Sequence, residues 1–436
     1  MIAAPKSSKI FFGWWTVVAC SVVGFLGVGV ASSGLSVLFK PIAAELGLSR
    51  AVASLAGGVQ SVGQGISGLA GGRATDRYGP RVAMLIGIGL LVLGLALMYF
   101  VRSLWAFLLV WGILVGIGFS FGCTFVTDTA IVRWFARKSG VAVNTKFAVQ
   151  SLSGVILLPA IAWFTTSQGW RLTCAVAAAV IAMVCIPLTW FLVKPHRPEH
   201  YGLPPDGATS RSGDGRPEES SGRMAVQTRG LEPPDFTLRQ AMRSRIYWIM
   251  ILVAYLSGAA APMMGVHCIP FLTDMGLSPV RAAATMSIVL TSSIPARLVT
   301  GFVLDRVKTI NLRFMIASGF FLQAAGVTAF LVTRSMTMIY VWFFLFGIGG
   351  GITQSVQIPL WARYFGRRAY GAILGSSMAM NVPMALAAPV YIGWVYDRTG
   401  TYLGVIFALA VLVGLAGVAA FFILPPKPVL RGAIEA

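Results

Sequence analysis

Twelve stretches of about 20 mostly apolar residues follow one another along this 436-residue chain, and they restrict its fold more than any other feature. A helix of roughly 20 apolar residues spans the hydrocarbon core of a bilayer, where backbone groups find no water to bond. We therefore predict an all-α membrane protein with twelve transmembrane helices. The predicted spans are Phe11–Gly34, Val52–Leu69, Val82–Val101, Leu104–Ile131, Gly140–Phe164, Leu172–Val193, Ile246–Leu272, Ala282–Val303, Phe314–Val332, Met336–Leu360, Ala372–Val395 and Leu403–Leu424.

Composition and the placement of charge support this class. Hydrophobic residues make up 57% of the chain and charged residues 11%. A globular domain of this length with such a composition would not be soluble in water. The net charge of +20 does not indicate a nucleic-acid partner, because the basic residues recur in alternate connections between spans. This positive-inside pattern predicts a multi-pass plasma-membrane protein, in a bacterial inner membrane, with both termini cytoplasmic. The connections concerned carry Lys6 and Lys9; Arg73, Arg77 and Arg81; Arg133, Arg137 and Lys138; Arg306, Lys308 and Arg313; Arg363, Arg367 and Arg368; and Lys427 and Arg431.

One long non-apolar segment, Lys194–Arg245, divides six predicted spans from six. Its Gly202–Asp235 part is rich in glycine, proline, serine and both signs of charge, and it cannot bury enough apolar surface to order itself. It is predicted to be a cytoplasmic linker. The expected organisation is an N-terminal six-helix bundle over residues 1–193, a linker over residues 194–245 and a C-terminal six-helix bundle over residues 246–436.

The last part of the linker contains a helix-start signal. Thr237-Leu-Arg-Gln240 fits a capping box, in which a threonine and a glutamine three residues later bond each other's backbone N–H groups. This predicts either a short helix on the inner surface or the frayed start of the seventh span.

The two halves repeat each other at an offset of about 230 residues. Gly72-Arg-Ala-Thr-Asp76-Arg77 after the second span corresponds to Gly301-Phe-Val-Leu-Asp305-Arg306 after the eighth, and Pro159 corresponds to Pro389. Such internal symmetry predicts two pseudo-symmetric six-helix bundles that face each other across a site near the middle of the membrane.

The segment Gly72-x-x-x-Asp76-Arg77-x-Gly79-x-Arg81 resembles the signature between the second and third spans of the major facilitator superfamily, and Gly301, Asp305 and Arg306 form a partial copy of it. The resemblance covers essentially the whole chain and implies the major facilitator fold. It also implies that these residues form a latch, in which the aspartate caps a neighbouring helix and pairs with an arginine across the bundle interface. Such a latch must break when the cytoplasmic side opens.

Finer motifs are similar to those of the monocarboxylate transporter and oxalate/formate antiporter group. In that group the arginine of the eighth span binds the substrate carboxylate, which implies that role for Arg297, and a histidine near the substrate path corresponds to His267. The motifs are Gly13-Trp14-Trp15; Leu38-Phe39-Lys40; Trp134-Phe135-x-Arg137-Lys138; His267-x-x-Pro270-Phe271-x-x-Asp274-x-Gly276; and Arg297 followed by Gly301 and Asp305-Arg306.

The chain departs from this group at four places. Animal-type members carry a lysine in the first span and an aspartate in the eighth, where this chain has Ser33 and Ser293. The glycine expected in the fifth-span motif is Asn144 here. The oxalate antiporter carries a lysine in its eleventh span, whereas Ala372–Val395 contains no charged residue.

Arg297 is the main candidate for a substrate-binding group. Centring an arginine in a membrane helix costs roughly 2.5–3.5 kcal/mol, so it persists where it faces a partner, a cavity or a substrate. The eighth span contains no acidic residue to pair with it. A guanidinium binds a carboxylate through two parallel hydrogen bonds and stays charged at any pH. The alternative is a structural arginine held by an ion pair or by backbone carbonyls.

Other polar residues within the spans have two readings each. His267 and Asp274 are candidates for proton coupling, and His267 also for substrate binding; the alternatives are a packing histidine and an ordinary Asp-x-Gly turn. Asn381 and Gln354 are expected to line the substrate cavity, or to form hydrogen bonds between helices.

Asp128 in the fourth span and Lys146 in the fifth should lie at similar depth. We predict that they form an ion pair, because each charge alone would be costly to bury. The alternative is that Lys146 is a second contact for the substrate anion.

These observations predict a monomeric secondary carrier of small organic carboxylates, working in the lipid bilayer by alternating access and needing no cofactor. Proton symport of a C2–C5 monocarboxylate such as lactate or pyruvate is the leading version, and carboxylate exchange of the oxalate/formate type is the alternative. A drug exporter is less expected, because Ser151–Phe164 lacks the Gly-Pro-rich fifth-span motif of such exporters. An enzyme is not expected, because the three histidines form no clustered catalytic or metal-binding pattern.

Overall fold

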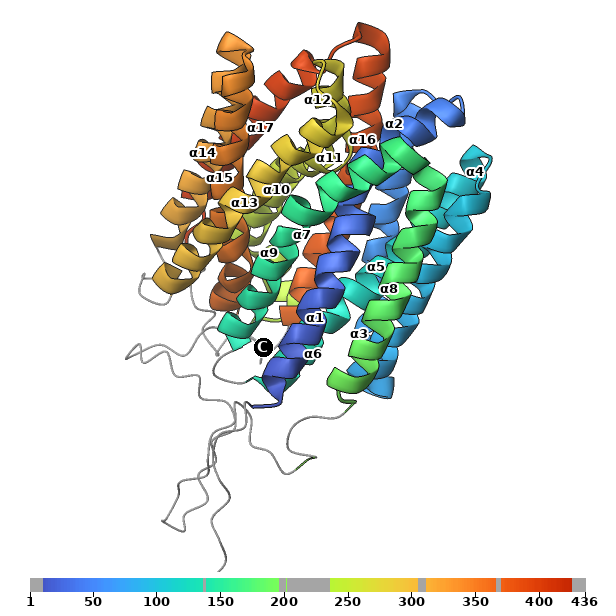
Figure 1. Cartoon of the computed structure of the whole chain (residues 1–436). Coiled ribbons are helices and arrows are strands. Elements are labelled where there is room, and N and C mark those ends of the chain that lie inside the picture. The colour runs from blue at the N-terminus through green and yellow to red at the C-terminus, as the bar shows by residue number, and fades with distance from the viewer. Residues whose placement is uncertain are drawn as a thin grey trace, which may run out of the picture.

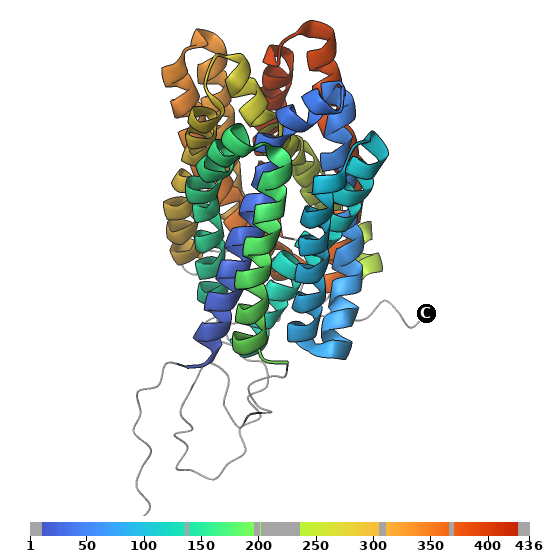
Figure 2. The same ribbon diagram turned by 45° about the vertical axis from the view of Figure 1, so that its right-hand side comes forward.

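The computed structural model describes residues 11–135, 139–195, 201, 236–304, 311–365 and 370–425. Regular structure in these residues is entirely helical. The long helices run side by side in two groups (Figures 1 and 2). Following the predicted orientation, we call the end of the molecule that carries the connection between α12 and α13 the outer end, and the opposite end the inner end.

The predicted spans all fall on helices. In the N-terminal bundle the elements are α1 (Gly13–Gly27), the π-helical segment η1 (Val28–Ser33), α2 (Gly34–Glu45), α3 (Arg50–Leu97), η2 (Met98–Phe100), α4 (Leu104–Phe107), η3 (Leu108–Val115), α5 (Gly116–Phe119), η4 (Ser120–Phe125), α6 (Val126–Trp134), α7 (Ser139–Gln168) and α8 (Trp170–Leu192). In the C-terminal bundle they are α9 (Leu238–Arg243), α10 (Arg245–Gly258), α11 (Ala260–Pro262), the π-helical segment η7 (Met263–His267), α12 (Cys268–Asp274), α13 (Pro279–Leu304), α14 (Leu312–Thr333), α15 (Met336–Phe365), α16 (Tyr370–Thr399) and α17 (Leu403–Phe421).

Ten helices in the described ranges are long and apolar enough to cross a membrane. The second and eleventh predicted spans are also helical and lie in the first half of α3 and in α16.

α3 comprises two predicted spans, the second and the third, and the chain turns between them at Gly79. This residue has φ 79° and ψ 161°, a conformation that strains any residue with a side chain. A Cβ atom at Gly79 would also lie 2.7 Å from the carbonyl oxygen of Pro195. The turn therefore requires glycine.

The short helix predicted from the capping box is confirmed. The Thr237 hydroxyl accepts a hydrogen bond from the backbone N–H of Gln240, and the Gln240 side chain accepts one from the backbone N–H of Thr237. Ser244 then ends α9 and caps α10 with its own side chain. The segment is thus a separate helix before the seventh span and not its frayed start.

The two bundles face each other through two pairs of helices, α7 against α13 and α3 against α16. Glycines bring α3 and α16 together: a Cβ atom at Gly393 would lie 2.6 Å from the backbone nitrogen of Ala51, and one at Gly58 would lie 2.8 Å from the carbonyl oxygen of Leu386. Between α13 and α7, the Ser287 hydroxyl donates to the Gly154 carbonyl. Small residues serve this purpose in membranes because close backbone approach maximises packing.

Candidate functional site

A cavity of about 590 Å³ lies mainly within the C-terminal bundle and reaches two residues of the N-terminal bundle. Most of its wall comes from α10, η7, α13, α15 and α16 of the C-terminal bundle, and Ser32 and Ser33 of η1 belong to the N-terminal bundle. Two of the four π-helical segments in the described residues, η1 and η7, contribute to the wall. Single π-helical turns inside α-helices recur at functional sites, because they redirect side chains and backbone groups locally.

Arg297 lines this cavity. One terminal nitrogen of its guanidinium donates to the Gln354 side-chain oxygen over 2.7 Å. Its Nε atom is buried and has no hydrogen-bond partner. The carbon of the guanidinium lies 5.9 Å from the centre of the Phe147 ring on α7, so the arginine also meets the opposite bundle.

The charge of Arg297 has no counter-ion in the cavity. Among the described residues of the cavity wall it is the single charged side chain. A buried unpaired donor costs on the order of 1–3 kcal/mol, and more when it is charged. A carboxylate would satisfy both the charge and the free N–H.

The two predicted amide liners, Gln354 and Asn381, are both in the cavity wall, as expected. Gln354 bonds Arg297 on the neighbouring span, whereas the Asn381 amide nitrogen donates to the Ser377 carbonyl of its own helix over 2.9 Å. Gln357 also lines the cavity and was not predicted from the sequence. Its position three residues after Gln354 puts it on the same helix face, and this spacing was the available signal.

Ser33 and Ser293, the two positions where the chain departs from animal-type members, both line the cavity. The wall therefore offers hydroxyl groups where those members carry a lysine and an aspartate. Over the described wall residues, no side chain other than Arg297 is ionisable.

His267 does not line the cavity in this conformation. It is fully buried, with Nε2 3.0 Å from the carbonyl oxygen of Pro389 and Nδ1 3.2 Å from the hydroxyl of Tyr402. A carbonyl oxygen only accepts, so Nε2 must carry a proton. The Tyr402 oxygen accepts from Arg50 over 2.7 Å, which leaves its own proton for Nδ1. The neutral imidazole is thus satisfied at both nitrogens, and any direct contact with substrate needs a different conformation.

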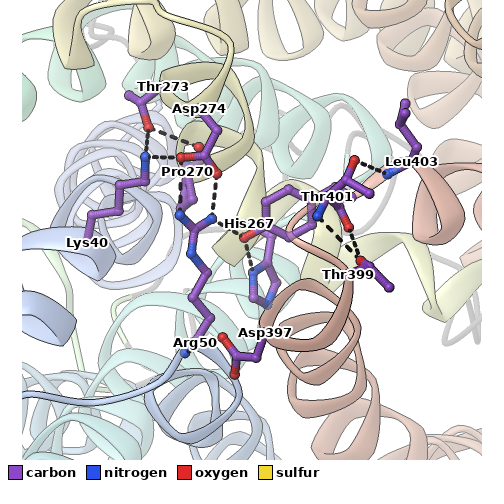
Figure 3. A network of polar contacts seen from close by, with 11 residues as sticks. Lys40, Arg50, His267, Pro270, Thr273, Asp274, Asp397, Thr399, Thr401 and Leu403 are labelled. Atoms are coloured by element: carbon purple, nitrogen blue, oxygen red, sulfur yellow. Dashed lines mark hydrogen bonds and ion pairs between the residues drawn. The ribbon is translucent and has the colours of Figure 1, made fainter.

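Asp274 lies in a network of polar groups at the outer end of the molecule (Figure 3). Its carboxylate lies 2.6 Å from the ammonium of Lys40 in α2. The Arg50 guanidinium donates to both of its oxygens, over 2.6 Å and 3.1 Å. Lys40 and Arg50 belong to the N-terminal bundle and Asp274 to the C-terminal bundle, so these ion pairs hold the bundles together at the outer end.

A second carboxylate, Asp397 near the end of α16, reinforces the contact. Its two oxygens accept from the backbone N–H groups of Arg50 and Ala51, over 3.1 Å and 3.0 Å. An aspartate of one bundle therefore caps the helix α3 of the other, where the helix dipole favours negative charge. The Arg50 guanidinium also stacks on the Tyr396 ring at 3.6 Å.

Sequence reasoning named Lys40 and Asp274 but not the network. Arg50 directly precedes the second predicted span and Asp397 follows the eleventh, so each reads as an ordinary charged residue at a membrane interface. Only the fold shows that these helix ends meet.

We expect Asp274→Asn to open this outer contact, because it removes the carboxylate that pairs with both Lys40 and Arg50. Cys268 on α12, the residue after His267, is 1% exposed. A membrane-impermeant maleimide added from the outer side should label Cys268 several-fold faster in the variant, as measured by mass spectrometry of the labelled peptide.

Glu45→Gln is the matched control for this experiment. It also removes one carboxylate at the outer end, but the partner of Glu45 is Arg171 of the same bundle. Labelling of Cys268 should stay at the wild-type rate in this variant. Equal rates in the wild type and in Asp274→Asn would show that the ion pairs do not close the outer end.

Asp128 and Lys146 form the predicted ion pair, with the Lys146 ammonium 2.6 Å from an Asp128 oxygen. The Lys146 side chain is fully buried, whereas 39% of the Asp128 side chain is exposed. Lys146 is not part of the cavity wall. The arrangement favours a structural pair inside the N-terminal bundle over a second substrate contact.

Part of the predicted inner latch lies outside the described residues, namely Asp305 and Arg306, together with the side chain of Asp76. Gly72 lies in α3, and Arg77 contacts the ring of the adjacent Tyr78. Arg81 donates to the Val193 carbonyl over 2.6 Å, which ties α3 to the end of α8 within one bundle. The latch across the bundle interface stays a prediction.

Comparison with known proteins agrees with this architecture. Residues 17–389 match the family model described as Major Facilitator Superfamily, and the chain therefore belongs to this superfamily. It is 22% identical to the protein named uncharacterized MFS-type transporter YcxA of Bacillus subtilis (strain 168), over 93% of each chain. It is 23% identical to monocarboxylate transporter 2 of Homo sapiens, over 75% of this chain and 68% of the relative. It is also 23% identical to the agnestins efflux protein AgnL12 of Paecilomyces divaricatus, over 73% of this chain and 66% of the relative.

Proposed function

We propose that this major facilitator superfamily protein is a secondary carrier of organic carboxylates that binds one carboxylate group at Arg297. The observation that carries the proposal is the buried, unpartnered Nε of a guanidinium that faces a cavity without a counter-ion in its described wall. The similarity to a monocarboxylate transporter supports the same substrate class.

The charge of the cavity favours a monocarboxylate over a dicarboxylate. Arg297 neutralises one negative charge, and the remaining described wall is made of hydroxyl, amide and apolar groups. A second carboxylate would stay unpaired in a low-dielectric site, at a cost of several kcal/mol. Lactate and pyruvate should therefore bind better than oxalate, malonate or succinate.

Alternating access follows from the two-bundle design. Lys40 and Arg50 of one bundle pair with Asp274 of the other, and we infer that these contacts close the outer end in the conformation described. A bound carboxylate neutralises Arg297, so the bundles can rock past each other without an unpaired charge. We further propose a monomer in a bacterial inner membrane with both termini cytoplasmic, as the distribution of basic residues favours.

Proton symport is the leading form of coupling, with His267 and Asp274 as the titratable groups. Both belong to the outer network, so they become accessible to external protons when that network opens. Exchange of carboxylates is the second candidate. It is favoured by the described cavity wall, which contains no titratable group beside Arg297, so a carrier without substrate keeps an unpaired positive charge.

Uptake into proteoliposomes under imposed pH gradients distinguishes the two. For a symporter, lactate uptake should rise as external pH falls, because more carriers are then protonated, and His267→Ala should flatten this dependence more than it weakens binding. Oxalate should be a poor substrate under all gradients. Efficient oxalate exchange that ignores the pH gradient would replace the symport assignment with an exchanger.

A further inference from the structure

Two glycines in the cavity wall, Gly265 of η7 and Gly350 of α15, have no neighbouring atoms at the position that a side chain would occupy. A Cβ atom built on either would meet no other atom within 4 Å. Their neighbour Gly351 differs, because a Cβ atom there would lie 2.7 Å from the Ser293 carbonyl oxygen. Gly351 is thus required for helix packing, whereas Gly265 and Gly350 border open space.

Helix packing therefore does not explain these two glycines. A glycine inside a helix is about 1 kcal/mol less favourable than an alanine. In membrane helices this cost is offset where the missing side chain lets two helix backbones pack closely, as at Gly351. At Gly265 and Gly350 the absence of a side chain instead makes the cavity larger.

The same cavity wall also contains large apolar side chains. Met264, Met286 and Met384 line the cavity, together with Phe320 and Phe346. Methionine side chains adapt to ligands of different shape because they are unbranched and polarisable. The volume of about 590 Å³ falls in the range of roughly 300–1,000 Å³ that holds drug-sized ligands. Acids of two to five carbons would leave most of it unfilled.

We propose that the substrate is a monocarboxylate with an apolar body larger than that of the C2–C5 acids, such as an aryl or branched alkyl group, and that Gly265 and Gly350 set its size limit. The carboxylate is held at Arg297 and the body lies against the methionines. This inference rests on the proposed function and extends the substrate size expected from the sequence.

The test measures binding by isothermal titration calorimetry, with the purified full-length protein in nanodiscs. The probes are three 2-hydroxy acids that differ only in their side chain: lactate, 2-hydroxy-4-methylpentanoate and 3-phenyllactate. Burying one methylene is worth about 0.8 kcal/mol, or roughly fourfold in affinity. We expect the Kd to fall along the series, by at least about tenfold from lactate to 3-phenyllactate.

A Cβ atom at Gly350 has no neighbour within 4 Å, so we expect the side chain of Gly350→Leu to extend into the open space, and leucine is the better helix former. We expect it to weaken 3-phenyllactate binding by at least about tenfold more than lactate binding, which removes the advantage of the larger acid. Gly350→Ala should have an intermediate effect. Gly89→Leu is the matched control, because Gly89 also has no neighbour within 4 Å of a Cβ atom but is exposed on α3, away from the cavity wall.

Two results would overturn the inference: 3-phenyllactate binding no better than lactate in the wild type, or Gly350→Leu weakening all three acids equally. Binding of the uncharged amide 3-phenyllactamide is measured as well, to distinguish a wrong size preference from a wrong proposed function. Equal binding of acid and amide would refute carboxylate recognition while the size preference stood. Tight binding of lactate alone, abolished by Arg297→Gln, would refute the size preference and keep the function.

Discussion

Arg297→Lys is expected to reduce carboxylate uptake by at least about a hundredfold, while the protein still inserts and purifies as a single species. Lysine keeps the positive charge but presents a point charge in place of the guanidinium fork. It loses the free Nε–H and the bond to Gln354, and hydrogen bonds to charged groups are worth about 1.5–3 kcal/mol each. The measurement is initial uptake of labelled lactate and 3-phenyllactate into proteoliposomes at equal protein content.

Arg281→Lys is the control for this substitution, because Arg281 lies on the same helix but is exposed near its outer end. It should transport at the wild-type rate. Near-normal uptake by Arg297→Lys would show that the carboxylate is held by charge alone and would remove two-point recognition from the mechanism.

The second large effect is a loss of stability when the ion pair of Asp128 and Lys146 is broken. The loss should depend on which of the two residues is changed. Asp128→Asn leaves a fully buried ammonium without its counter-ion, and breaking a buried pair in this way costs about 3–5 kcal/mol. Lys146→Met leaves a carboxylate that is 39% exposed and can be reached by water, so its cost should be smaller. The double variant should recover much of the stability, because a buried pair is worse broken than absent.

Thermal unfolding of the purified variants, together with their purification yield, measures these differences in stability. We expect the unfolding temperature to fall most in Asp128→Asn, less in Lys146→Met and least in the double variant. Loss of carboxylate affinity whenever Lys146 is changed, with no recovery of stability in the double variant, would instead make Lys146 a second contact for the substrate anion.

Much of the architecture was predictable because membrane insertion is governed by local sequence. Apolar length defines each span, and the internal repeat indicates two bundles. The capping box at Thr237 is a contact between residues three apart, so its sequence signal was sufficient. Arg297 could be singled out because a lone charge in an apolar span is costly wherever the span lies in the fold.

The tertiary structure decided what depends on residues far apart in the chain. Arg50 meets Asp274 across 224 positions and Asp397 across 347, and no local pattern encodes which helix ends meet. The sequence marks His267 as a candidate for substrate binding or proton coupling, and only the fold shows that it is buried and bonds Tyr402, which itself bonds Arg50. Gly350 and Gly351 are equivalent in the sequence, yet one faces the cavity and the other a neighbouring helix. Sequence thus determined which groups carry charge and which segments enter the membrane. The packing of the two bundles determined which of those groups meet and how much space remains between them, because both depend on the relative placement of whole helices.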